Sequence, residues 1–189
     1  MPYPLTIDDF ARMVEEGYFP EERRVYLCDG SLYEKMAKSK AHGLVGAAIN
    51  IALMRRLPKD WGVWPESTIA LDELNGPLPD LAVVRGADPL KFAREDRYPE
   101  PRDIGLLVEI AWTSLAKDLE YRERYARALI PVYWVADLQG RRLLAFSGPR
   151  VVDGRGEYER EAVYAAGEEI PLVLDGVEVA RIPAAEILP

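Results

Sequence analysis

Two acidic residues in apolar, strand-like surroundings are the strongest sign of chemistry in this sequence. Asp80 follows Pro79 and leads the apolar run 81–84, and Glu109 interrupts the apolar run 106–111. An ionised carboxylate that is buried alone is costly, so each acid needs a partner charge, several hydrogen bonds or a metal ion. If both lie on strands, the two acids could meet across a sheet and hold one divalent cation. Oxygen-only ligation of this kind favours Mg²⁺ or Mn²⁺.

The length and composition bound what the chain can be. Its 189 residues suit a single domain over 1–189, and 49% hydrophobic with 30% charged residues is typical of a globular protein. The net charge of −8 argues against broad, non-specific adhesion to nucleic acid but leaves room for a local basic groove. The single cysteine, Cys28, excludes an internal disulfide and a cysteine-based zinc site, and it is expected to be a small core residue.

The cellular setting is inferred from what the sequence lacks. The longest apolar runs have the length of strands, so no membrane span is expected. Residues 1–5 have neither the basic nor the apolar region of a signal peptide, which favours the cytoplasm. The scarcity of amide side chains, with two Asn and one Gln, is compatible with a thermophilic source.

Hydrophobic periodicity and turn residues predict helices and strands in mixed order. Helices are expected over 7–16, 40–57 and 115–128, with short turns at 89–93 and 183–187. Strands are expected over 24–28, 31–35, 61–65, 67–71, 80–84, 105–111, 132–136 and 142–146, followed by a β-rich tail. This order indicates an α/β or α+β fold in which helices flank a mixed sheet. On the second helix, the stripe expected to pack on the sheet is Leu44, Ala47, Ala48, Ile51 and Met54.

The helix that follows Glu109 carries a charge on its predicted apolar face. The stripe consists of Leu115, Leu119, Arg122, Ala126 and Leu129. Asp118 lies one turn before Arg122 and could pair with it. In one interpretation, Arg122 is a buried counter-ion for Asp118 and Glu109. In the other, Arg122 lies beside a scissile phosphate, where its fixed charge stabilises the transition state.

With these residues in place, the chain resembles the Uma2 family, a bacterial group of endonucleases within the PD-(D/E)XK nuclease superfamily. The resemblance extends over about residues 5–180. The matching stretches are Cys28–Gly30, Glu34–Met36 with His42, Leu78–Val84, Leu107–Ala111, Thr113–Asp118, Tyr125–Ala128 and Ile130–Asp137. Each stretch alone is weak evidence, whereas their order and spacing together are specific.

The resemblance implies a restriction-endonuclease-like core, a DNA substrate and a divalent metal. Asp80 and Glu109 match the two family acids, which would hold Mg²⁺ or Mn²⁺ together with the Ile110 carbonyl. The lysine expected two residues after the second acid is absent, because Ala111 stands there. The Uma2 pattern carries a lysine on the following helix, and in this register that position is Arg122.

Four further residues are auxiliary candidates. His42, the only histidine, is either a structural residue or a group that orients an acid or a phosphate. Glu34 is either a solvated hairpin residue or an additional acid at the metal. Lys117 and Asp118 lie near the predicted helix start, where Lys117 is expected to point away from the site.

Two functions from different classes remain open. The leading hypothesis is a metal-dependent endonuclease in which Asp80 and Glu109 hold Mg²⁺ and Arg122 neutralises phosphate charge. The alternative is a catalytically weakened family member that binds nucleic acid or a partner protein, which the missing lysine and the acidic net charge favour. A homo-oligomer, most simply a C₂ dimer, is expected because two-fold symmetry lets a nuclease address both strands.

Overall fold

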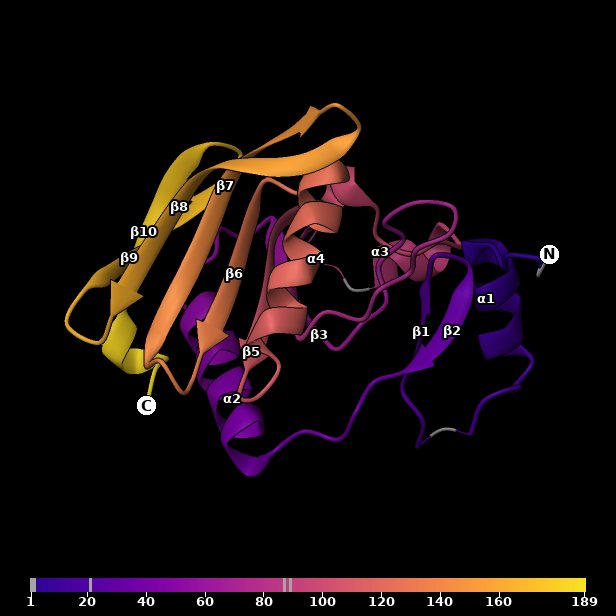
Figure 1. The fold of residues 1–189 in the computed structure, drawn as a ribbon, viewed down its shortest axis with the longest axis horizontal. Coiled ribbons are helices and arrows are strands. Elements are labelled where there is room, and N and C mark those ends of the chain that lie inside the picture. Colours follow the sequence, from indigo (N-terminus) through magenta and orange to yellow (C-terminus); the bar gives the residue numbers. More distant parts are fainter. Residues whose placement is uncertain (1–2, 21, 87, 89) are drawn as a thin grey trace.

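The computed structural model describes residues 3–20, 22–86, 88 and 90–189 (Figure 1). The helices are α1 (Ile7–Glu15), α2 (Lys40–Met54), α3 (Leu90–Arg94) and α4 (Leu115–Arg127), with short 3₁₀ helices at Pro101–Asp103 and Ala184–Glu186. The strands are β1 (Val25–Cys28), β2 (Ser31–Glu34), β3 (Trp61–Pro65), β4 (Leu81–Arg85), β5 (Ile104–Ala111), β6 (Val132–Asp137), β7 (Arg142–Val152), β8 (Arg155–Ala165), β9 (Glu169–Leu174) and β10 (Val177–Pro183).

A six-stranded mixed sheet in the order β3-β4-β5-β6-β7-β8 forms the centre of the molecule. Its neighbouring strands are antiparallel except for β5 and β6, which run parallel and are connected through α4. The pairs β1-β2 and β9-β10 form separate two-stranded ribbons. The mixed α+β architecture expected from the sequence, including the additional C-terminal strands, is therefore confirmed.

Alternate residues of the central strands supply two cores, because successive side chains on a strand point to opposite faces. On one face, Val108 and Ile110 of β5 pack with Ile49 of α2 and with the β9-β10 ribbon. On the other face, Leu107 and Ala111 belong to the core that includes Tyr125 of α4. Figure 1 shows α4 lying along the sheet, with the β1-β2 hairpin and α1 forming a lobe at the opposite end from β9-β10.

The register between β4 and β5 brings the two acids together. Leu81 is paired with Val108, and continuing this antiparallel register by one residue sets Asp80 opposite Glu109. Directly opposed residues of an antiparallel pair have Cβ atoms about 4.5–5.5 Å apart. The two acids are distant in sequence but meet because Asp80 precedes Leu81, Glu109 follows Val108, and Leu81 is paired with Val108.

The local predictions fail at two places. Residues 67–71 do not form a strand; their backbone is bonded irregularly instead, with Ile69 N–H donating to the Pro77 carbonyl and Ala70 N–H to the Pro99 carbonyl. The buried face of α2 contains Val45, Ile49, Ala52 and Leu53, whereas Leu44, Ile51 and Met54 of the predicted stripe are exposed. Apolar residues surround this helix on all sides, so periodicity could not select the packed face.

Two other expectations concern chain ends and loops. Thr6 caps α1, the helix expected over 7–16, since its hydroxyl accepts the Asp9 N–H. The predicted helical turn at 89–93 is observed as α3, although Pro89 lies outside the described residues. Among the described helices, none has the length and apolar character needed to cross a bilayer.

Candidate active site

Asp80 is buried, with 3% of its surface exposed, and is compensated on both carboxylate oxygens. Oδ2 accepts the Ile110 N–H at 2.8 Å. The paired residues of β4 begin only at Leu81, so the Asp80 side chain takes the place of a backbone acceptor for this N–H. Oδ1 accepts from the Lys35 ammonium at 2.8 Å and lies 2.9 Å from Lys38 Nζ. Burial alone would raise the pKa of Asp80, but the neighbouring His42, Lys35 and Lys38 hold it well below its usual range.

Glu109 is equally buried, with 6% of its surface exposed, but is compensated much less. Its Oε1 accepts a hydrogen bond from the Tyr125 hydroxyl at 3.1 Å, and its Oε2 lies 3.6 Å from Lys35 Nζ. Burial raises the pKa of Glu109 to about 8, and the Asp80 charge adds to this rise against the opposing effect of Lys35. The two opposed carboxylates therefore prefer different protonation states near neutral pH.

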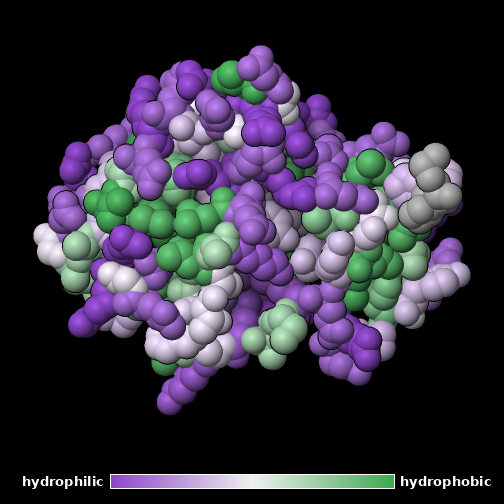
Figure 2. Space-filling view, viewed as in Figure 1, coloured by the Kyte–Doolittle hydropathy of each residue, from purple (hydrophilic) through white to green (hydrophobic). Residues whose placement is uncertain are grey.

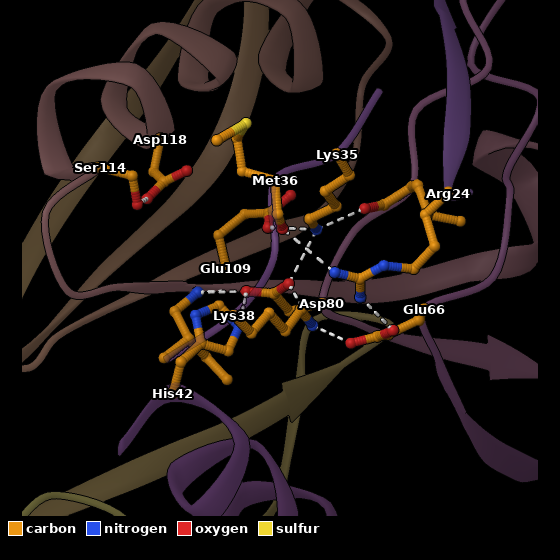
Figure 3. A network of polar contacts seen from close by, with 12 residues as sticks. Arg24, Lys35, Met36, Lys38, His42, Glu66, Asp80, Glu109, Ser114 and Asp118 are labelled. Carbon is orange, nitrogen blue, oxygen red and sulfur yellow. Dashed lines mark hydrogen bonds and ion pairs between the residues drawn. The ribbon is translucent and has the colours of Figure 1, made fainter. Parts of the chain in front are cut away.

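The ammonium of Lys35 joins the two acids (Figure 3). It contacts both carboxylates and also donates to the Leu78 carbonyl at 2.7 Å. The Glu109 and Asp80 charges more than offset the burial of Lys35, so its pKa is raised above the ordinary lysine value. Lys35 is thus a fixed cation between the acids.

His42 approaches Asp80 from the first turn of α2. Its Nε2 is buried and lies 3.1 Å from Asp80 Oδ2, but the ring N–H is not aligned well enough to make a hydrogen bond. Ser39 caps the helix by accepting the His42 backbone N–H, which fixes the start of α2 beside the acid. Lys38, just before this cap, extends the network from Asp80 to Glu66, which Arg24 also contacts (Figure 3).

These groups line a pocket of about 550 Å³ between α4, the start of α2 and the segment after β2. Lys35, Lys38 and Lys117 provide its cations, and Tyr121 and Tyr125 of α4 lie on its wall. Exposed Met36 and Trp112 are also among its lining residues. Figure 2 shows a hydrophilic band running down the middle of this view between two hydrophobic patches. The three lysines give this acidic chain a local group of cations, in a pocket that Asp80, Glu109 and Asp118 also line.

Arg122 lies outside this pocket, contrary to the sequence expectation. Its side chain is 47% exposed, lies 3.6 Å from Glu161 on β8 and covers the ring of Phe146 on β7. Tyr121, one position earlier on α4, is among the residues that line the pocket. One residue turns a helix by about 100°, so this small difference in register moves the guanidinium to another face.

The auxiliary candidates have mixed outcomes. Asp118 is buried but accepts a hydrogen bond from Ser114 at 2.6 Å instead of pairing with Arg122, and burial raises its pKa. Lys117 lines the pocket, where the sequence interpretation had pointed it away. Glu34 is 54% exposed and lies 3.7 Å from Arg23, so it does not reach the acids.

The alternation of the hairpin explains why Lys35, and not Glu34, enters the site. Val25 pairs with Glu34, and the Lys35 N–H donates to the Arg24 carbonyl, so the β1-β2 ladder continues through Lys35. Consecutive side chains of a paired strand point to opposite faces. Sequence reasoning missed Lys35, Lys38 and Tyr125. The one local signal for Lys35 was that it follows Glu34 in a strand, so that its side chain points to the opposite face.

The donor atoms at the acid pair fit a magnesium-type ion. Within the described part of the chain, no group of three or more His, Cys, Asp and Glu side chains is arranged around a metal position. Mg²⁺, however, usually takes one or two carboxylates and completes its shell with water and substrate phosphate. The N–H and C=O of one strand residue point to the same edge. The Ile110 carbonyl therefore faces the side on which its N–H meets Asp80, and it can act as a third oxygen ligand.

A mixed sheet that presents two opposed carboxylates beside a lysine-lined pocket is compatible with a nuclease-like protein. The chain belongs to the Uma2 family, described as "Putative restriction endonuclease", whose model matches residues 7–183. A solved structure of a "putative nuclease belonging to DUF820" from Anabaena variabilis shares the fold with a TM-score of 0.65 and 12% sequence identity, covering 97% of each chain. No curated protein sequence matches the chain.

Proposed function

We propose that this protein is a divalent-metal-dependent endonuclease that hydrolyses phosphodiester bonds in DNA. The observation that carries the proposal is the opposition of Asp80 and Glu109 across the β4-β5 register, at one pocket with Lys35 between them. Hydrolysis adds water across one P–O ester bond and leaves a phosphate monoester and a free hydroxyl. The family description supports the nuclease class, and the fold of its structural neighbour is compatible with it.

Asp80, Glu109 and the Ile110 carbonyl would hold Mg²⁺ or Mn²⁺, which polarises the phosphoryl oxygen and lowers the pKa of an attacking water. Glu109 must lose its proton to serve as a ligand, and Lys35 stabilises the ionised form. Lys38 and Lys117 attract the DNA backbone, and His42 lies against Asp80 at the first turn of α2. Arg122 has no part in this mechanism because its guanidinium lies against Phe146.

A second function, binding without cleavage, is favoured by one observation. Lys35 and Lys38 already neutralise Asp80, so this acid is compensated without any metal ion. A protein of this kind would bind nucleic acid or a partner through the lysine-lined pocket.

Nicking of supercoiled plasmid distinguishes the two functions. Wild-type protein should nick the plasmid with Mg²⁺ or Mn²⁺ but not with EDTA, and the near-isosteric variant Asp80→Asn should lose at least about 10²-fold in rate, the scale of one removed electrostatic group. Circular dichroism should confirm that the variant is folded. DNA binding without metal-dependent nicking, at equal levels for wild type and Asp80→Asn, would overturn the endonuclease in favour of the binding module.

A further inference from the structure

The acid pair needs a cationic group that can act on a phosphate, and neither position suggested by the sequence supplies it. Residue 111 follows Glu109 by two positions on the same face of β5, but it is a buried alanine. Arg122 is exposed and contacts Glu161 instead of the pocket. The cation has to come from another part of the chain.

We propose that Lys35, at the end of the N-terminal β1-β2 hairpin, is this catalytic residue and donates to a non-bridging oxygen of the scissile phosphate. The inference rests on the proposed function. An ammonium group has three donors. Two are committed, one to the Leu78 carbonyl at 2.7 Å and one to Asp80 Oδ1 at 2.8 Å. The third is not held at hydrogen-bonding distance by Glu109, whose Oε2 lies 3.6 Å away.

The anchoring of Lys35 distinguishes it from the other lysines of the pocket. Its bond to the Leu78 carbonyl does not involve either acid, so the ammonium stays beside the site when Asp80 turns to another partner. The Lys35 backbone is also fixed, because its N–H donates to the Arg24 carbonyl.

Lys38 and Lys117 are less suited to this role. Lys38 contacts Asp80 but is shared with Glu66, on the side of the network away from Glu109. Lys117 lies over the Tyr26 ring, with Nζ 5.9 Å from the ring centre. Among the pocket-lining lysines that the structure describes, Lys35 contacts both acids, and it is therefore the cation nearest to a phosphate held between them.

The alternative role for Lys35 is that of a counter-ion that only permits the two acids to be buried. Lys35→Met removes the charge while keeping a similar stem, and Lys35→Arg keeps the charge but changes the donor geometry. A counter-ion tolerates the arginine, whereas a donor aimed at one oxygen does not. Lys40→Met, at an exposed position at the start of α2, is the matched control.

The experiment measures single-turnover cleavage of a labelled DNA duplex at saturating protein and Mn²⁺, together with Mn²⁺ affinity by calorimetry and thermal melting. Lys35→Met should reduce the cleavage rate about 10²-fold or more, with Mn²⁺ bound as tightly as by wild type or more tightly, because a repelling charge has gone. Lys35→Arg should lose at least about tenfold, and Lys40→Met should cleave like wild type.

Each contrary outcome has a distinct meaning. Wild-type rates for Lys35→Arg, or a defect of Lys35→Met that is fully restored by more Mn²⁺, would overturn the catalytic role and leave the proposed endonuclease intact. If Lys35→Met does not fold, the Lys35→Arg rate decides the matter alone. If wild type does not cleave with any divalent metal, both the endonuclease and this role of Lys35 are overturned.

Discussion

Asp80 and Glu109 are chemically similar residues to which the fold gives different acidities. Asp80 has His42, Lys35 and Lys38 as neighbours, and they lower its pKa against the effect of burial. Glu109 relies on a tyrosine hydroxyl and a more distant ammonium, so burial dominates and its pKa rises to about 8. Near pH 7 and without metal, Asp80 is therefore ionised while Glu109 retains its proton.

This difference predicts a pH-dependent stability that is specific to Glu109. The unfolded chain ionises this carboxyl near its ordinary pKa of 4.5 and the folded protein near 8, so stability present below pH 4.5 is lost as the pH rises to 8. Relative to the non-titrating Glu109→Gln, metal-free wild type should lose up to about 5 kcal/mol across this range. Urea unfolding of both proteins at pH 5, 6.5 and 8 measures the difference. Parallel stability curves would contradict the prediction.

At the scale of single residues, the sequence predicted the acids but not the charges around them. Asp80 and Glu109 could be predicted because an acid in an apolar strand is conspicuous. Arg122 was misplaced because charged residues occupy most of α4, so the stripe could be drawn one residue too far. Lys35 gave no comparable signal, since only the tertiary structure brings the end of the hairpin to the acids.

The elements show a similar division between local and long-range information. The hairpin turn at Asp29-Gly30 and the strands around the acids follow from turn residues and apolar runs, which act over a few positions. The packed face of α2 does not, because both faces are apolar and only the tertiary structure selects Val45 and Ile49. The segment 67–71 likewise depends on distant carbonyls at Pro77 and Pro99.

The contact of the β7-β8 hairpin with α4 gives a prediction for this helix. Gly156 lies so close to α4 that a Cβ there would overlap the Glu123 carbonyl and the Arg127 nitrogen, which are backbone atoms that cannot rotate away. Gly156→Ala should therefore lower the free energy of unfolding by about 1–3 kcal/mol, the usual cost of overpacking. Chemical denaturation measures the loss. Gly167→Ala, where a Cβ would meet nothing within 4 Å, is the control, and equal losses in both variants would refute the explanation.

The whole molecule combines a net charge of −8 with a pocket lined by lysines. This distribution favours local recognition of a phosphate backbone over general adhesion to nucleic acid, because the rest of the surface repels it. The affinity for DNA should therefore fall with salt concentration by an amount that reflects only the few lysines in the pocket.

We expect the protein to be a C₂ dimer, the commonest symmetric assembly and one suited to acting on two antiparallel strands. Light scattering coupled to size exclusion should give about twice the chain mass of 21.3 kDa over a tenfold range of concentration. A constant mass of one chain across that range would contradict the expectation.

The register that opposes Asp80 to Glu109 also sets the moment at which the protein can first act during its synthesis. The hairpin lysine leaves the ribosome first, then the aspartate, and the glutamate last. Glu109 is held in position by Tyr125 and by the parallel partner β6, whose last residue is Asp137. Translation products that end between Glu109 and Val132 contain both acids but lack β6, the parallel partner of β5. For the endonuclease proposed above, a chain that ends before β6 would therefore lack a complete site.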